Sequence, residues 1–424
     1  MLETLLAPAF GAALLISLGM RLWLASRQMR HVSRHRNAVP EAFAQQVTLP
    51  AHRKAADYTV AKGRLSLLSF ALSAAILLGW TWLGGLDWLN TELRDNLLPA
   101  YGSMAYQLGL LSVVMFVGAL LDLPLDAYST FRVEQRFGFN RMSVGLWLGD
   151  QARGLLLGAA IGLPLAALVL WIMQAAGPLW WAWAWGAWMG FNLLLMVIFP
   201  TWIAPLFNKF EPLTDAALRQ RVESLMTRCG FTAKGLFVMD GSRRSAHGNA
   251  YFTGLGAAKR VVFYDTLLAR LTPTEVEAVL AHELGHFKHR HITQRLLAMA
   301  AMSLIGMALL GWLAGQSGFY TALGVQPNLT ASNDALALLL FLMVVPLFGY
   351  FVSPWMSALS RHHEFQADAY ACAQASAADL AQALVKLHED NAATLTPDPI
   401  YVRFYYSHPA AAERLAALRP GLAA

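Results

Sequence analysis

The segment AVLAHELGHFKHRH, residues Ala278–His291, places two histidines four residues apart and a glutamate next to the first of them. Residues four apart lie one above the other on the same face of an α-helix. If the segment is helical, His282 and His286 can present two imidazole nitrogens to a single metal ion. The rest of the chain must then supply a further ligand and a scaffold for this site.

The residues that precede the segment predict that it is helical. LTPTEV, Leu271–Val276, has Thr272 at the N-cap position, Pro273 at the first helical position and Glu275 three residues after the threonine. This combination is a capping box, and the apolar residues at its two ends form a hydrophobic staple. We therefore predict a helix that begins at Pro273 and carries both histidines.

The two histidines together with Glu283 are typical of a zinc hydrolase. A zinc ion lowers the pKa of water to about 7, and Glu283 is placed to take a proton from that water as it attacks a carbonyl carbon. The alternative is a basic amphipathic helix whose histidines only contact solvent. The chain has two cysteines, Cys229 and Cys372, which are too few for a cysteine-rich zinc site.

A catalytic zinc takes a third protein ligand and keeps a fourth position open. The best candidate for the third ligand is Glu364 in SRHHEFQADAYA, residues Ser360–Ala371. Three other residues remain as alternatives: His362, His363 and Glu389. Charged residues just after an apolar segment can also be a simple collar at the membrane exit, but the H-E-x-x-H helix favours the metal role.

Two further residues are predicted to support the site. Asp368 follows Glu364 by four residues and can accept a hydrogen bond from a ligand histidine. Gly285 lies between the two histidines, where a glycine makes a helix about 1 kcal/mol less stable than an alanine does. We expect the helix that carries Glu364 to pack closely against Gly285.

The composition indicates a membrane protein. Of 424 residues, 57% are hydrophobic and 14% are charged, and the mean hydropathy is +0.44. The net charge of +6 and the pI near 9.4 could indicate nucleic-acid binding, but most arginines and lysines flank apolar segments, as topology signals do. We therefore expect a lipid bilayer as a partner and no nucleic acid.

Seven stretches are long and apolar enough to span a bilayer. They are approximately Leu5–Leu24, Leu65–Leu83, Met104–Leu121, Leu155–Met173, Trp180–Trp202, Leu296–Ala314 and Ala335–Trp355. The first has no basic leader ahead of it and is expected to be a permanent span.

The charges of the connecting loops predict the topology. Residues 27–64 contain eight arginines and lysines, whereas the connection around Asp87–Asp95 is net acidic. By the positive-inside rule the N-terminus lies outside, and the C-terminus lies in the cytoplasm. The predicted organisation is five spans in 1–202 with cytoplasmic loops 25–64 and 122–153, a cytoplasmic protease domain in 203–294, two spans in 295–355, and a C-terminal helical part of the protease domain in 356–424.

Three short segments ahead of the motif helix read as strands broken by turn residues. They are LFVMD (Leu236–Asp240), NAYFTGL (Asn249–Leu255) and RVVFYD (Arg260–Asp265). We predict that they form a small antiparallel sheet.

The chain resembles the type I CAAX prenyl protease family. The zinc motif and SRHHEFQAD are joined, in order along the chain, by four further similar segments: FRVEQRFGFN (Phe131–Asn140), PLFNKFEPL (Pro205–Leu213), SAHGNAYFTG (Ser245–Gly254) and YSHPAAAER (Tyr406–Arg414). The resemblance implies a mainly α fold with seven transmembrane helices around an intramembrane chamber, plus a cytoplasmic gluzincin-type α+β zinc protease domain with one Zn²⁺.

The resemblance also implies roles for residues outside the zinc motif. Asn249 and His408 would stabilise the bound peptide and the tetrahedral intermediate, with Arg414 and Arg361 as supporting residues behind the site. The segment from Asn249 through Ala250, Tyr251 and Phe252 would be an edge strand that pairs with the substrate backbone.

The expected function is hydrolysis of peptide or protein substrates near the membrane surface. In the family the last three residues are removed after a prenylated cysteine, while the arginine-rich and alanine-rich composition indicates a bacterial inner membrane, where proteolysis of membrane-associated peptides without a lipid is the other expectation. Two alternatives remain: a heat-shock-type quality-control metalloprotease, and a transport or lipid-binding protein with a structural zinc.

Overall fold

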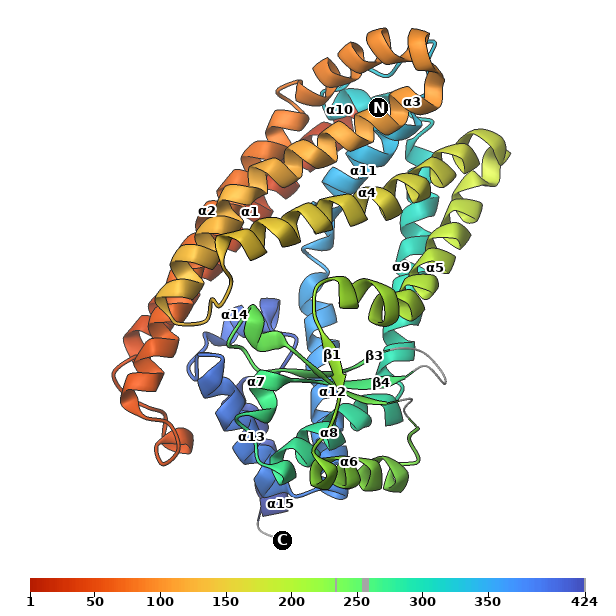
Figure 1. Cartoon of the computed structure of the whole chain (residues 1–424). Coiled ribbons are helices and arrows are strands. Elements are labelled where there is room, and N and C mark those ends of the chain that lie inside the picture. Colours follow the sequence, from red (N-terminus) through yellow and green to blue (C-terminus); the bar gives the residue numbers. More distant parts are fainter. Residues whose placement is uncertain (233–234, 254–258, 423–424) are drawn as a thin grey trace.

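The computed structural model of the chain describes residues 1–232, 235–253 and 259–422. Its helices are α1 (Leu2–His35), α2 (Leu49–Trp80), α3 (Gly85–Tyr128), α4 (Val144–Ala175), α5 (Trp180–Ile198), α6 (Ala216–Arg228), α7 (Asp265–Leu268), α8 (Pro273–Lys288), α9 (His291–Leu313), α10 (Ser317–Ala322), α11 (Asp334–Gly349), α12 (Ser353–Gln374), α13 (Ala377–Asp390), α14 (Pro399–Tyr405) and α15 (Ala411–Leu422). Its strands are β1 (Phe210–Pro212), β2 (Leu236–Met239), β3 (Ala250–Thr253) and β4 (Arg260–Tyr264). The two termini lie at opposite ends of an elongated molecule (Figure 1).

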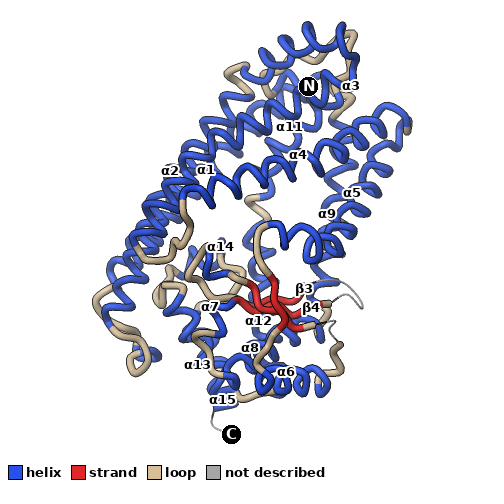
Figure 2. Tube along the Cα trace, viewed as in Figure 1, coloured by secondary structure: helices blue, strands red, loops and turns tan. Residues whose placement is uncertain are grey.

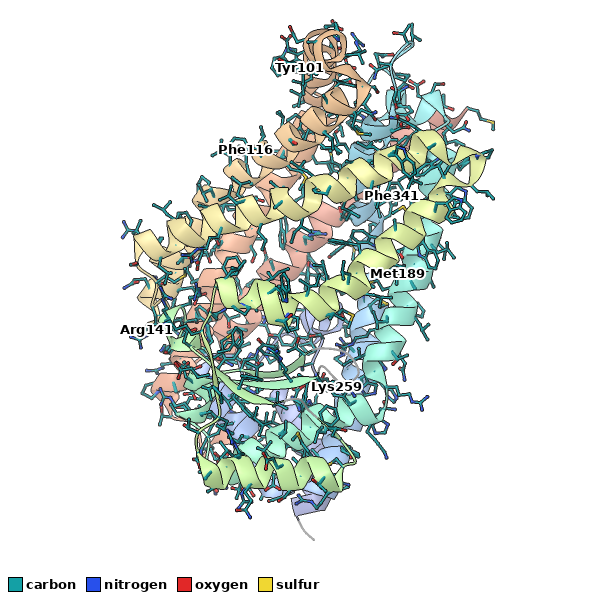
Figure 3. All side chains as sticks on the ribbon, turned by 45° about the vertical axis from the view of Figure 1, so that its right-hand side comes forward. Tyr101, Phe116, Arg141, Met189, Lys259 and Phe341 are labelled. Atoms are coloured by element: carbon teal, nitrogen blue, oxygen red, sulfur yellow. The ribbon has the colours of Figure 1, made fainter. Side chains whose placement is uncertain are left out.

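Within the described residues, six long helices are apolar enough to cross a membrane. They comprise α1, α2, α3, α4, α5 and α9. Large apolar side chains point outward from them: Phe116 of α3 is 52% exposed, Leu156 of α4 is 70% exposed and Trp183 of α5 is 67% exposed, and Figure 3 shows Phe116 on the outer surface. Apolar side chains on the outside of long helices suit a lipid environment, so the expected multi-span helical membrane fold is confirmed.

Several helices extend well beyond the predicted spans. α1 continues to His35 and α2 begins at Leu49, so much of the predicted loop 25–64 is helical. The acidic connection around Asp87–Asp95 is helical too, because α3 begins at Gly85 and is broken only at Gly102, whose φ of 81° interrupts the helix. The hydropathy of the sequence marks the apolar part of a helix and not its polar extensions.

The seventh predicted span, Ala335–Trp355, is divided between two helices. α11 ends at Gly349, α12 begins at Ser353, and the two axes differ by 64°. Two prolines explain the break: Pro346 removes a backbone donor near the end of α11, and Pro354 sits in the first turn of α12. The bent pair together is long and apolar enough to form a seventh crossing.

The sheet is mixed, so the predicted antiparallel sheet is wrong in part. The strand order is β1-β2-β4-β3; β1 pairs antiparallel with β2 and β3 with β4, but β2 and β4 are parallel. The chain passes from β2 to the far edge, forms β3, and returns through β4 between them, which makes β2 and β4 run in the same direction. β1 was not predicted, and residues 254 and 255 of the second predicted segment, Asn249–Leu255, lie outside the described residues.

The strands lie at one end of the molecule among α6, α7, α8 and α12 (Figure 2). The predicted capping box is present at the start of α8: Glu275 N donates to Thr272 Oγ1, and Thr272 N donates to the Glu275 carboxylate at 2.7 Å. Val276, Leu280 and Leu284 of α8 are buried in the core of this region. α8 is therefore fixed on its apolar side, and its histidine face is left for α12.

Candidate active site

The structure brings His282, His286 and Glu364 together. His282 Nε2 lies 3.3 Å from His286 Nε2 and 3.3 Å from Glu364 Oε2, and His286 Nε2 lies 3.5 Å from Glu364 Oε1. Among the described residues they form the group of His, Cys, Asp and Glu side chains close enough to hold an ion. The alternative ligands His362, His363 and Glu389 are not part of it.

These distances fit a metal ion. Ligands at about 2.0–2.1 Å from a tetrahedral zinc lie about 3.3–3.4 Å from one another, close to the three separations found here. Glu364 is 2% exposed, and its Oε2 is a buried oxygen that accepts no hydrogen bond within the described part of the chain. A buried carboxylate oxygen without a donor is well suited to a cation. The three residues therefore fit the ion that their motif predicts.

Gly285 allows α12 to come this close. A Cβ added at Gly285 would lie 2.8 Å from Ala367 Cα and 3.0 Å from the Ala367 carbonyl oxygen, both backbone atoms of α12. Such a contact would force the two helices apart, so the close approach expected at Gly285 is present. It places Glu364 opposite the two histidines of α8.

Charged residues hold His282. Its Nδ1 lies 2.8 Å from Asp368 Oδ1, and Arg414 Nε donates to Asp368 Oδ2 at 2.8 Å. Because a carboxylate only accepts, His282 Nδ1 carries the proton and Nε2 is left with its lone pair toward Glu364. Asp368 and Arg414 are 2% and 6% exposed, so the structure places both where a supporting role requires them.

A different chain of hydrogen bonds holds His286, through two residues that the sequence reading did not assign. Gln366 Oε1 lies 2.8 Å from His291 Nε2, and His291 Nδ1 lies 2.9 Å from His286 Nδ1. Since the amide oxygen only accepts, His291 Nε2 must donate, its Nδ1 must accept, and His286 Nδ1 must carry a proton. The Nε2 lone pair of His286 is thereby left for an ion. Arg290, whose φ of 57° is left-handed, lies between the end of α8 and the start of α9 at His291, and the sequence carried no signal for this turn.

The titration of α8 reflects this arrangement. Burial would lower the pKa of His282, but the neighbouring Asp368 and Glu364 carboxylates raise the pKa to about 9. Burial and the neighbouring His282 lower the pKa of His286 to about 3. Burial raises the pKa of Glu283, and Glu364 adds to that shift. A carboxyl with a raised pKa beside a cation site is suited to accept a proton.

A cavity of about 670 Å³ opens on this site. His282, Glu283, Asn249, His408 and Arg414 all line it. His408 Nε2 lies 3.5 Å from Glu364 Oε1, and its side chain is 62% exposed. The structure thus brings the predicted base and both residues expected to bind the peptide into one space.

The hydrogen bonds of the Arg361 side chain go to the backbone near His408 and not to the three candidate ligands. Its Nη1 donates to the carbonyl oxygens of Val402 and Tyr406, at 3.2 and 2.8 Å. These carbonyls belong to the end of α14 and the residue after it, just before His408. Arg361 therefore anchors the segment that carries His408.

The predicted substrate strand is an edge strand. β3 pairs with β4 on one side and stands last in the sheet order, with Ala250 opposite Phe263 and Thr253 opposite Arg260. Ala250 lines the 670 Å³ cavity, whereas Phe252 lines a second cavity of about 550 Å³. Tyr251 packs edge-on against Tyr264, 6.1 Å between ring centroids. β3 thus joins two cavities on either side of the candidate metal site.

The family model described as CAAX prenyl protease N-terminal, five membrane helices, matches residues 28–209, and that of Peptidase family M48 matches residues 212–420. CAAX prenyl protease 1 of Saccharomyces cerevisiae is 33% identical, covering 93% of this chain and 91% of its own. The CAAX prenyl protease 1 homologs of Arabidopsis thaliana and Homo sapiens are 36% and 31% identical, covering 81% and 97% of this chain and 79% and 95% of their own.

The crystal structure of S. mikatae Ste24p superimposes with a TM-score of 0.91 at 32% identity and covers 99% of both chains. Two family models that follow one another along the chain, relatives above 30% identity over most of it, and this superposition agree. The chain belongs to peptidase family M48, among the CAAX prenyl proteases, and is a multi-span membrane metalloendopeptidase.

Proposed function

We propose that the metal is zinc and that the enzyme removes the three residues that follow a prenylated cysteine at the C-terminus of a peptide or protein. The observation that carries this proposal is the set of three donor atoms at 3.3–3.5 Å, with His282 and Glu283 both lining the cavity beside the edge strand β3. The names of the relatives, CAAX prenyl proteases, support the choice of substrate.

The residues of the site divide the chemistry between them. His282, His286 and Glu364 would hold the zinc, which when bound polarises the scissile carbonyl and a water. Glu283 accepts a proton from the attacking water and passes it to the leaving amine nitrogen as the peptide bond breaks.

Asn249 and His408 act on the substrate itself. Both line the cavity, and both side chains can donate hydrogen bonds to the carbonyl oxygen as negative charge develops on it. A closed structural zinc site would instead need a fourth protein ligand and no base, and the open cavity beside Glu283 favours catalysis.

The bilayer is the second partner. The second cavity is lined by Leu195 and Met196 of α5 together with Phe252 and Phe287. Figure 3 shows Met189 on α5 and Lys259 near the strands, two elements that border this cavity. Asn192, Lys259, His286 and Arg290 line it as well. We place the lipid of the cysteine against the apolar wall of this cavity, between a spanning helix and the substrate strand. From the loop charges we place the enzyme in a bacterial inner membrane, with the N-terminus outside and residues 203–294 and 356–424 in the cytoplasm.

Cleavage of matched peptides tests the proposal. Purified protein is given a farnesylated CAAX peptide and the same peptide without the lipid, with Glu283→Gln and a chelator as controls. We expect cleavage of the lipidated peptide to exceed that of the other, no cleavage with chelator, and zinc retained but cleavage lost by about 10²–10⁴-fold in Glu283→Gln. Equal cleavage of both peptides would favour general membrane proteolysis, and full activity of Glu283→Gln would contradict the assignment.

A further inference from the structure

The edge strand β3 has a direction relative to the two cavities. Asn249 and Ala250, at its start, line the 670 Å³ cavity, and Phe252 and Thr253, at its end, line the 550 Å³ cavity. The chain direction of β3 therefore runs from the larger cavity to the smaller one. Any peptide that pairs with β3 must lie across both.

Antiparallel pairing fixes which end of the substrate enters which cavity. β3 already pairs antiparallel with β4, and a peptide added antiparallel to its free edge runs from the smaller cavity to the larger one. The residues that precede the scissile bond then lie among Leu195, Met196 and Phe252, and those that follow it lie in the larger cavity. A substrate cut three residues from its end places its terminal carboxylate about 10 Å into that larger cavity.

Two of the described residues that line the larger cavity are a lysine or an arginine, Lys62 and Arg414, and one of them is available to bind an anion. Arg414 is buried and bonded to Asp368, whereas Lys62 of α2 is exposed. Within the described ranges, no carboxylate lies within 4.0 Å of Lys62 Nζ, which sits 5.0 Å from the centre of the Tyr58 ring. Glu134, which is bonded to Tyr58 Oη at 2.6 Å, lies 3.5 Å from His247 Nε2.

We propose that Lys62 binds the C-terminal carboxylate of the substrate and so sets the distance from the chain end at which cleavage occurs. This inference rests on the proposed function and names the group that reads the free end. An ammonium and a carboxylate form a charge-assisted hydrogen bond, which a C-terminal amide cannot replace. Lys62 acts on the substrate at a distance from the scissile bond and takes no part in the chemistry.

The other half of the substrate agrees with this polarity. If the carboxyl end lies in the cavity with Lys62, the residue before the scissile bond faces the apolar cavity beside α5, where a lipid-bearing side chain is best accommodated. Parallel pairing would reverse both ends, placing the lipid next to Lys62 and the carboxylate in the cavity beside α5, where Lys259 and Arg290 stand with Phe252 and Phe287. The direction of the substrate therefore rests on antiparallel pairing with β3, and Lys259 and Arg290 are the cations that would meet the carboxylate if the pairing were parallel.

The test compares two substrate ends in four proteins. Peptides that end in farnesyl-Cys-Val-Ile-Met are prepared with a free carboxylate and with a C-terminal amide, and kcat/KM is measured for wild type, Lys62→Gln, Lys62→Arg and Arg64→Gln. Arg64 is an exposed cation on the same helix outside the lining of both cavities, and it serves as the matched control. We expect wild type to prefer the free acid by about 10-fold, Lys62→Gln to lose that preference with the amide cleaved as before, and the other two variants to keep it.

A binding measurement separates this inference from the proposed function. The tripeptide Val-Ile-Met, as free acid and as amide, is titrated into the zinc-loaded full-length protein, and the acid is expected to bind more tightly only when residue 62 is cationic. This readout does not depend on cleavage, so a protein that cuts neither peptide still reports on Lys62. Equal binding of acid and amide to wild type, or an unchanged preference in Lys62→Gln, would overturn the proposal.

Discussion

His282 and His286 lie one turn apart on α8, yet their second nitrogens meet different partners. His282 Nδ1 faces the Asp368 carboxylate, itself paired with Arg414, whereas His286 Nδ1 faces the neutral pair His291 and Gln366. The charged support gives a stronger hydrogen bond, but it buries a carboxylate and a guanidinium. The neutral support, His291 and Gln366, buries no charge. It orients His286 only if each hydrogen bond has its donor and its acceptor on the required atoms. The two ligands should therefore differ in what their loss does to folding as well as to metal binding.

Removing the charged support should have the largest effect. Asp368→Ala leaves the buried Arg414 without its partner and His282 without its acceptor. We expect zinc affinity to fall by about 10–100-fold and the free energy of unfolding to fall by about 3–5 kcal/mol. Chelator competition and thermal unfolding measure the two quantities. Glu389→Ala, at an exposed acid on α13, is the control, and equal results for both variants would contradict the role of Asp368.

Separating the two helices should affect both histidines together. Gly285→Ala places a Cβ 2.8 Å from Ala367 Cα, so α8 and α12 must move apart and the three ligand atoms with them. We expect the unfolding free energy to fall by about 1–3 kcal/mol and zinc binding to weaken. Gly306→Ala in α9, where the added atom has a neighbour at 3.8 Å, should be tolerated. A Gly285→Ala protein as stable as wild type would show that the contact can relax.

Removing the neutral support should weaken the metal without a comparable loss of stability. His291→Phe keeps a ring stacked on His363, 4.0 Å between centroids, but removes both nitrogens. We expect zinc affinity to fall by about 10-fold, with an unfolding midpoint close to wild type. His289→Phe, one position before the turn residue and exposed, is the matched control. If the midpoint of His291→Phe falls as far as that of Asp368→Ala, the distinction between the two supports is lost.

Making the two supports alike should have the smallest effect. Gln366→Glu gives His291 a charged acceptor in place of the amide oxygen, while it loses the amide donor near His362 Nε2. We expect zinc affinity to rise by about two- to threefold, because a carboxylate makes the histidines behind it more basic. Isothermal titration with zinc checks this, and weaker binding than wild type would show that the contact with His362 matters more.

Local signals predicted the motif helix and the three candidate ligands well. The capping box at Thr272 and the spacing of His282 and His286 depend on residues a few positions apart, and the pairing with Glu364 followed from the demand of zinc for a third ligand. His291 and Gln366 could not be assigned from the sequence. Their role depends on the left-handed turn at Arg290 and on a contact between two residues that lie 75 positions apart in the sequence. The parallel pairing of β2 with β4 was missed for a similar reason, since it depends on the path of the chain between them. The break between α11 and α12 was visible in Pro346 and Pro354, but hydropathy alone runs through both.

That break has a mechanical consequence. Glu364 stands eleven residues after the start of α12, about 16 Å along the helix axis from the 64° bend, and α11 is the apolar half of the candidate seventh crossing. A bilayer thinner or thicker than the apolar length of α11 tilts that helix, and a rotation of 5° passed through the bend would displace the carboxylate by about 1.4 Å. We therefore expect the thickness of the surrounding bilayer to shift Glu364 relative to His282 and His286, so that detergent and bilayers of different thickness give different metal affinities in the same protein.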